Sequence, residues 1–205
     1  MQKNLLLVTA AALVLIGSSV WADPTDQPGH ASPAPGTTSD TAAAVKDTAR
    51  HVSGTISAEM TSTLAGFVTA AATSDMYEVE AGKIAEDRAQ NPDVKAFAEK
   101  MVKAHTATTE KLKALLADTH ASVAPPAHLD DRRQGMIDEL RGAKDADFDG
   151  RYLSQQIDAH KEALILMKGY AKDGDVAAIK KFAAKTAPVV QMHLNMAQHL
   201  ADAKK

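Results

Sequence analysis

The chain has 205 residues, with 23 Lys and Arg against 26 Asp and Glu, a net charge of −3, eight histidines and no cysteine. This charge balance argues against nucleic acid as a partner, because phosphate binding relies on an excess of Lys and Arg. The lack of cysteine excludes disulfides, thiolate metal ligands and cysteine nucleophiles. Aromatic residues make up only 4% of the chain, which favours helices over aromatic-rich strands.

Residues 1–22 have the pattern of a secretory signal peptide. Lys3 precedes an apolar run of about twelve residues, whereas a membrane-spanning helix needs about 20. Val20 and Ala22 place the predicted cleavage directly after Ala22. Cleavage would leave a periplasmic protein with no stable membrane insertion and a possible, unidentified partner in the cell envelope. An uncleaved N-terminal anchor is the alternative interpretation.

Residues 23–60 are predicted to form a disordered linker. Four prolines lie there among Gly, Ser, Thr and Ala, and such a segment buries too little apolar surface to offset its chain entropy. From residue 61 to 203 the apolar residues follow a helical period instead. This change predicts a single helical domain over residues 61–203.

The first half of this domain is expected to hold two long helices and a short one. The first long helix covers residues 62–90. The second begins at Asn91-Pro92, because Asn is a good N-cap and Pro fits the first helical turn, and it ends near residue 120. A short helix over residues 130–141 is expected to cross the end of the bundle.

Two further long helices complete the domain. Asp147 is the expected cap of the third, Gly174 its C-terminal residue, and Asp175 the cap of the fourth. Pro188 should kink or split the fourth helix, because proline lacks a backbone donor. The apolar stripe of this helix is expected to run through Ile179, Phe182, Thr186, Val189, His193, Met196 and Leu200. Four such helices predict an all-α, antiparallel four-helix bundle.

Each long helix carries one ionisable side chain on its apolar face: Glu78, His105, His160 and His193. A metal ion inside a bundle requires this pattern, since facing helices must each project a ligand to one point. Glu78 and His105 are nearly equidistant from the turn that joins their helices, so they should lie level. When residues are counted in the same way from the turn between their helices, His160 and His193 are offset by about 7 Å along the bundle axis.

Three imidazoles and a carboxylate suit Zn(II), Fe(II), Mn(II) or Cu(II). Asp75, three residues before Glu78, is either a second carboxylate ligand or a partner of a ligand. Met101, Met167 and Met196 lie on the faces of the three histidines, where thioether sulfur would favour Cu(I) or methionine would simply fill the core. A buried hydrogen-bond cluster of His and Glu without metal is the competing interpretation.

Several segments occur together in a recognisable order: Glu78-Val-Glu-Ala-Gly82, Val94-Lys-Ala-Phe-Ala98, Met101-Val-Lys-Ala-His105, Phe148-Asp-Gly-Arg-Tyr152 and His193-Leu194. Through them, residues 64–200 resemble a bacterial family known as domain of unknown function 4142 (DUF4142), labelled as predicted outer membrane proteins. The resemblance implies a ferritin-like helical fold. Ala104 departs from the family pattern, which usually has an acidic residue directly before the second-helix histidine.

Ferritin-like di-iron enzymes take Glu-x-x-His pairs from two helices. Here Val102, Ile157 and Val190 stand three residues before the candidate histidines, so oxidase activity is not supported and no catalytic residue is assigned. The sequence predicts an exported bundle that binds one transition-metal ion, in metal handling or envelope stress protection. The alternative is a non-enzymatic envelope interaction or structural module with a metal-free His and Glu cluster.

Overall fold

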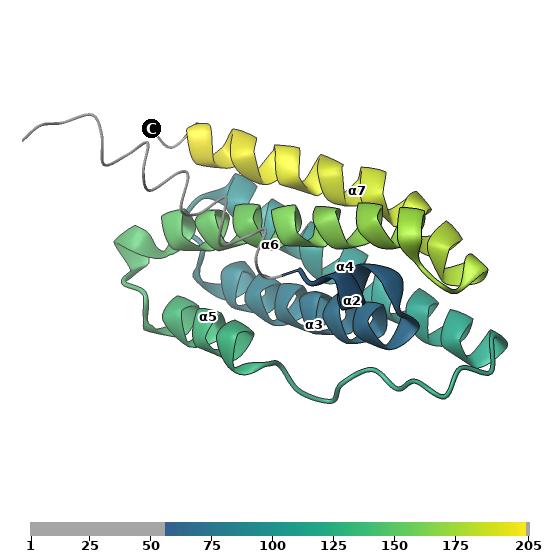
Figure 1. The fold of residues 1–205 in the computed structure, drawn as a ribbon. Helices are drawn as coiled ribbons and strands as arrows, with labels where there is room; N and C mark the ends of the chain where they lie inside the picture. The colour runs from purple at the N-terminus through teal and green to yellow at the C-terminus, as the bar shows by residue number, and fades with distance from the viewer. Residues whose placement is uncertain (1–55, 204–205) are drawn as a thin grey trace, which may run out of the picture. The chain divides into compact units, whose positions relative to one another are not determined.

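A computed structural model describes residues 56–203, and all secondary structure in this part is helical (Figure 1). The predicted signal peptide and the predicted linker up to residue 55 lie outside the described residues. Residues 58–60, the end of the predicted linker, belong to helix α2 (Ala58–Ser62) instead, so the predicted linker extends too far. None of the described helices is long and apolar enough to cross a membrane. The helices are α2 Ala58–Ser62, α3 Leu64–Arg88, α4 Pro92–Asp118, α5 Asp131–Gly142, α6 Asp145–Asp173 and α7 Ala177–Asp202.

The four long helices form the predicted antiparallel bundle. α3 packs against α4 and α6, and α7 packs against α6 and α4, so each long helix has two neighbours. Arg88 at the end of α3 bonds to Asp145 at the start of α6, and Leu64 at the start of α3 bonds to Asp175 just after α6. The segment from α4 to α6 therefore runs back along the bundle. One such long crossover is the ferritin-like connectivity, which confirms the expected fold class.

The short helix α5 lies along α3 and α6, so the expectation that it crosses the end of the bundle was wrong (Figure 1). Arg88 of α3 explains this placement. Its guanidinium donates to the carbonyl oxygens of Leu140, Arg141 and Ala143 at 2.6–2.8 Å. These are carbonyls at the C-terminal end of α5, which have no partner within the helix. Arg141 also pairs with Glu80 of α3 at 2.6 Å.

The helix starts confirm one predicted cap and correct two. α4 begins as expected, with the Asn91 side chain accepting from the Asp93 backbone N–H. α6 begins at Asp145 with no side-chain cap, so Asp147 does not cap it. Asp175 does not cap α7 either, because that helix begins two residues later. Its carboxylate instead accepts from the Tyr170 hydroxyl at 2.7 Å and the Leu64 backbone N–H at 3.2 Å.

Gly174 and Pro188 were the two positions where the sequence predicted a change in the course of α6 or α7. Gly174 ends α6 as predicted, at an ordinary negative φ of −63°. A Cβ at this glycine would lie 2.5 Å from the Tyr170 ring, so close packing against that ring is what requires glycine there. α7 continues through Pro188, so of the two outcomes expected there, a kink or a split, the split does not occur.

The core consists of two hydrophobic clusters stacked along the bundle axis. One contains mainly Tyr77, Ala81, Phe97, Met101, Ile137, Phe148, Tyr152 and Leu153. The other contains mainly Phe67, Val68, Leu112, Leu166, Tyr170, Ile179, Phe182 and Val190. On every long helix a buried ionisable residue lies between the positions that enter the two clusters. They are Asp75, His105, His160 and His193, and we call them, together with the buried Glu78 one turn after Asp75, the polar layer.

The first prediction concerns Asp149, which is buried and accepts from the backbone N–H groups of Gln90 and Asn91, each at 3.0 Å. Replacement of Asp149 by Asn should lower the free energy of unfolding by about 1–3 kcal/mol, because a charged acceptor of two backbone donors is lost. Urea unfolding of wild type and variant would measure this change in the free energy of unfolding. The exposed Asp147→Asn is the matched control and should change little; equal losses would contradict this role of Asp149.

The second prediction concerns pH. The hydrogen bond from Tyr170, with a smaller contribution from the Leu64 backbone N–H, lowers the pKa of Asp175 below its usual value despite some opposing desolvation. Because the Asp175 carboxyl has a lower pKa in the folded chain, its ionised form stabilises the fold. The stabilisation is fully present above the pKa of the unfolded chain, about 3.9, and it is lost as the pH falls through the lower pKa of the folded chain. The difference in unfolding free energy between wild type and Asp175→Asn should be constant near pH 7 and shrink below pH 4. If the difference in unfolding free energy between the two proteins did not change with pH, a lowered pKa of Asp175 in the folded state would be refuted.

Candidate metal centre

Three of the four predicted ligands converge in the polar layer. His105 of α4, His160 of α6 and His193 of α7 are 6%, 1% and 3% exposed. Their ring centroids are 5.6 Å apart for His105–His160 and His160–His193, and 5.9 Å apart for His105–His193. Each ring offers a nitrogen within 4.8 Å of those of the other two. We call this group the histidine triad.

His193 reaches the triad because the α6–α7 connection is longer than the sequence count assumed. α6 ends at Asp173 and α7 begins only at Ala177. His160 is thirteen residues before the end of α6, and His193 is sixteen residues after the start of α7. The mismatch therefore falls from five residues to three, or about 4.5 Å at 1.5 Å per residue. Side-chain reach covers this remainder.

The orientation of His105 is set by a carboxylate of the neighbouring helix. Its Nδ1–H donates to Oδ1 of Asp75 at 2.7 Å, and both residues are buried. Thr109 donates its hydroxyl to the other oxygen of Asp75 at 3.2 Å. Asp75 is thus a partner of a candidate ligand, which was one of its two predicted roles. A carboxylate behind an imidazole fixes its tautomer and raises its basicity, as in many metal sites.

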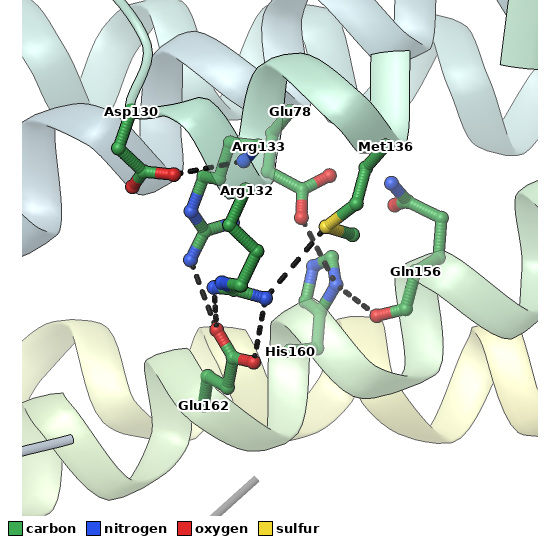
Figure 2. A network of polar contacts seen from close by, with 8 residues as sticks. All are labelled: Glu78, Asp130, Arg132, Arg133, Met136, Gln156, His160 and Glu162. Atoms are coloured by element: carbon green, nitrogen blue, oxygen red, sulfur yellow. Dashed lines mark hydrogen bonds and ion pairs between the residues drawn. The ribbon is translucent and has the colours of Figure 1, made fainter. Parts of the chain in front are cut away.

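His160 is held in a similar way by its own helix. Its Nδ1–H donates to the backbone carbonyl of Gln156, one turn earlier, at 2.8 Å. Figure 2 shows this bond together with the Glu78 carboxylate, whose Oε1 lies 3.6 Å from the same nitrogen. The Nδ1 of His160 is therefore occupied, and its Nε2 is the nitrogen that remains for a ligand.

Each histidine of the triad keeps one buried nitrogen without a hydrogen-bond partner among the described residues. These are Nε2 of His105, Nε2 of His160 and Nδ1 of His193. In His105 and His160 the unpartnered nitrogen is the one opposite the engaged Nδ1. Buried polar atoms in folded proteins nearly always have a partner, so three such nitrogens on three neighbouring rings mark a place for a ligand.

Glu78, the fourth predicted ligand, lies beside the triad and outside the group of mutually close ligand atoms. It is 1% exposed, and its Oε1 faces Nδ1 of His160 rather than Nε2. Neither of its oxygens accepts a hydrogen bond from a described residue. The sequence count placed Glu78 level with His105, but the carboxylate that contacts His105 is Asp75, one turn earlier on α3.

Burial and the neighbouring charges set the protonation of the triad. Burial lowers the pKa of His160, against the opposing charge of Glu78. Burial and the two neighbouring imidazoles lower the pKa of His193 to about 3. Burial would also lower the pKa of His105, but the hydrogen bond to Asp75 and the charges of Glu78 and Asp75 raise it above its usual value. His160 and His193 are therefore neutral at pH 7, as metal ligands must be.

An ion-pair network around the buried Glu162 of α6 lies next to the triad, and no sequence pattern indicated it. Arg132 and Arg133 of α5 both donate to the Glu162 carboxylate, at 2.6 and 3.1 Å for the closest contacts with Oε2 (Figure 2). Asp130 caps α5 by accepting from the Arg133 backbone N–H at 2.8 Å. The partners are about thirty residues apart in the chain, so no fixed spacing could indicate their pairing.

Comparison with known proteins identifies the family. The model described as domain of unknown function (DUF4142) matches residues 33–200, so the chain belongs to this family, as its sequence motifs suggested. No curated protein matches the chain. A solved structure described as CopM in the Cu(II)-bound form is similar, with a TM-score of 0.60 and 14% identity. The match covers 70% of this chain and 98% of that chain, and it shows a shared fold.

The third prediction uses Glu78 to separate a metal site from a metal-free hydrogen-bond cluster. In metal-free protein at pH 7, Glu78→Gln should raise the free energy of unfolding by on the order of 1 kcal/mol, because a buried charge without hydrogen bonds is costly. Chemical denaturation after chelator treatment would measure this. Glu80→Gln, which removes a half-exposed ion pair, is the control and should destabilise slightly. Clear destabilisation by Glu78→Gln would support the hydrogen-bond cluster.

Proposed function

We propose that this DUF4142 protein binds one transition-metal ion through His105, His160 and His193. The observation that carries the proposal is the convergence of three buried imidazoles from three different helices. Their rings offer nitrogens within 4.8 Å of one another, and each ring keeps one nitrogen without a hydrogen-bond partner among the described residues. A metal ion would satisfy all three at once. Three protein ligands would also leave a coordination position for water or a small exogenous ligand.

The donor set favours Cu(II), with Zn(II) as the next choice. Imidazole suits both ions, whereas Mn(II) prefers oxygen ligands and non-haem Fe(II) sites include a carboxylate. Neither carboxylate of the polar layer joins the triad: Asp75 is engaged with His105, and Glu78 faces the other edge of His160. Cu(II) also binds a given nitrogen site more tightly than Zn(II). The fold shared with a structure described as Cu(II)-bound is consistent with this choice.

The two carboxylates of α3 would instead compensate the charge of the ion. Asp75 and Glu78 are 4% and 1% exposed and lie directly behind His105 and beside His160. A divalent ion on three neutral imidazoles brings two positive charges into the core, and two carboxylates balance them. Asp75 would also keep the His105 ring in the tautomer that presents Nε2 to the ion.

The biological role that follows is metal handling or protection against metal stress, rather than turnover of an organic substrate. We place this role in the periplasm, where the predicted signal peptide of residues 1–22 would deliver the protein. An envelope partner would then supply or receive the ion. A structural or interaction module with a metal-free cluster is the alternative, and it predicts no stoichiometric binding.

The fourth prediction tests the ligand set directly. Untagged protein should bind one Cu(II) per chain, and His160→Gln should weaken binding by more than about 100-fold, since the loss of a ligand exceeds the 10–100-fold effect of an outer partner. Asp75→Asn should weaken it about 10–100-fold. Calorimetric titration in competition with a chelator, with elemental analysis, measures both.

His128→Gln, an exposed histidine outside the polar layer, is the matched control and should bind as wild type does. Bound metal should also raise the thermal midpoint of unfolding, because the ion binds only the folded chain tightly. Full occupancy in His105→Gln and His160→Gln together would rule out the triad. No binding by wild type would support the structural alternative.

A further inference from the structure

A groove of about 400 Å³ lies between α4 and α7, at the end of the bundle where α7 finishes. Asp93, Phe97 and Lys100 of α4 line one side, and Met196 and His199 of α7 line the other. Phe97 is buried and belongs to the core, so it forms the floor of the groove. A thioether and an imidazole therefore border the same open space.

Met196 and His199 are positioned to act together. They are three residues apart on one helix, so their side chains are neighbours on its surface. Met196 is partly buried against the core, and its Sδ lies 3.8 Å from Nζ of Lys100, a residue that lines the groove. His199 is exposed, and no described residue makes a hydrogen bond to its ring.

The other two methionines of the predicted stripes behave differently. Met101 is 0% and Met167 4% exposed, and both belong to the hydrophobic clusters. They fit the interpretation as core filler, since neither sulfur is open to solvent. Met196 alone among the three lines an open groove and has an imidazole one turn away.

We propose that Met196 and His199 form an outer site for a soft monovalent ion of the Cu(I) class. Thioether sulfur selects Cu(I) over the harder divalent ions, and imidazole is a good second ligand for copper. The site lies one turn of α7 beyond His193, so it is separate from the triad but adjacent to it. It uses a different donor set, and it stands whether or not the triad binds a metal.

Lys100 opposes this site in its present arrangement. Its ammonium group lies beside the Met196 sulfur and would repel an incoming cation. The Lys100 side chain is exposed and can turn away, so binding should displace it. Removal of this charge should therefore tighten binding, an effect opposite to that of removing a ligand.

The fifth prediction is tested with Ag(I), a redox-stable probe of Cu(I) sites, and full-length protein labelled at the methionine methyl groups. The Met196 methyl resonance should shift on titration with Ag(I) and saturate. Met196→Leu should abolish this binding, His199→Gln should weaken it at least about tenfold, and Lys100→Gln should tighten it. Met192→Leu, an exposed methionine of the same helix that does not line the groove, is the matched control and should have no effect.

The titration is repeated in His105→Gln, where the outer site should persist even though the triad has lost a ligand. Persistence there would support the outer site whatever the outcome for the triad. An unmoved Met196 resonance, or equal losses in Met192→Leu and Met196→Leu, would overturn the proposal. Loss of all Ag(I) binding in His105→Gln would overturn it as well, and would assign the soft ion to the triad.

Discussion

Burial of unpaired polar atoms between two apolar clusters is the constraint on which the rest of this structure depends. A buried polar atom without a hydrogen bond destabilises the fold, and in the polar layer three imidazole nitrogens and both oxygens of Glu78 have no hydrogen-bond partner among the described residues. Packing of the two clusters must offset this cost in the metal-free protein. A bound ion would remove most of this cost, so metal binding and folding stability should be strongly coupled.

The contacts at the two ends of the bundle hold the four long helices in the axial register that brings the residues of the polar layer together. Asp149 fixes the α3–α4 turn to α6, and Asp175 fixes the α6–α7 turn to the start of α3. At both ends of the bundle a carboxylate thus joins a hairpin turn to the other hairpin. Arg132 and Arg133 tie α5 to Glu162, close to His160 on the same helix. These contacts leave the helices little freedom to slide, so the register of the histidines is set by the scaffold.

The sequence predicted the elements of this structure better than the contacts between them. The bundle, the Asn91 cap and the burial of all four candidate residues followed from helical period and capping rules. Val189 was assigned to the buried stripe but is 43% exposed, and Val190 is buried in its place, because a period of 3.6 residues allows steps of three or four. The pairing of Asp75 with His105 and of Arg132 with Glu162 depends on distances between helices, which a local pattern does not contain.

The polar layer divides its chemistry among the helices. α4, α6 and α7 each supply one imidazole, whereas α3 supplies the two carboxylates and no candidate nitrogen ligand. A di-iron centre requires carboxylates in the coordination shell itself, so this division argues against that chemistry on structural grounds as well as on sequence spacing. The same division separates metal binding from charge compensation. Loss of a histidine should lower the affinity for the metal ion, whereas loss of the Glu78 carboxylate should change the stability of the metal-free protein. Because these two effects fall on different residues, they can be measured independently in one bundle.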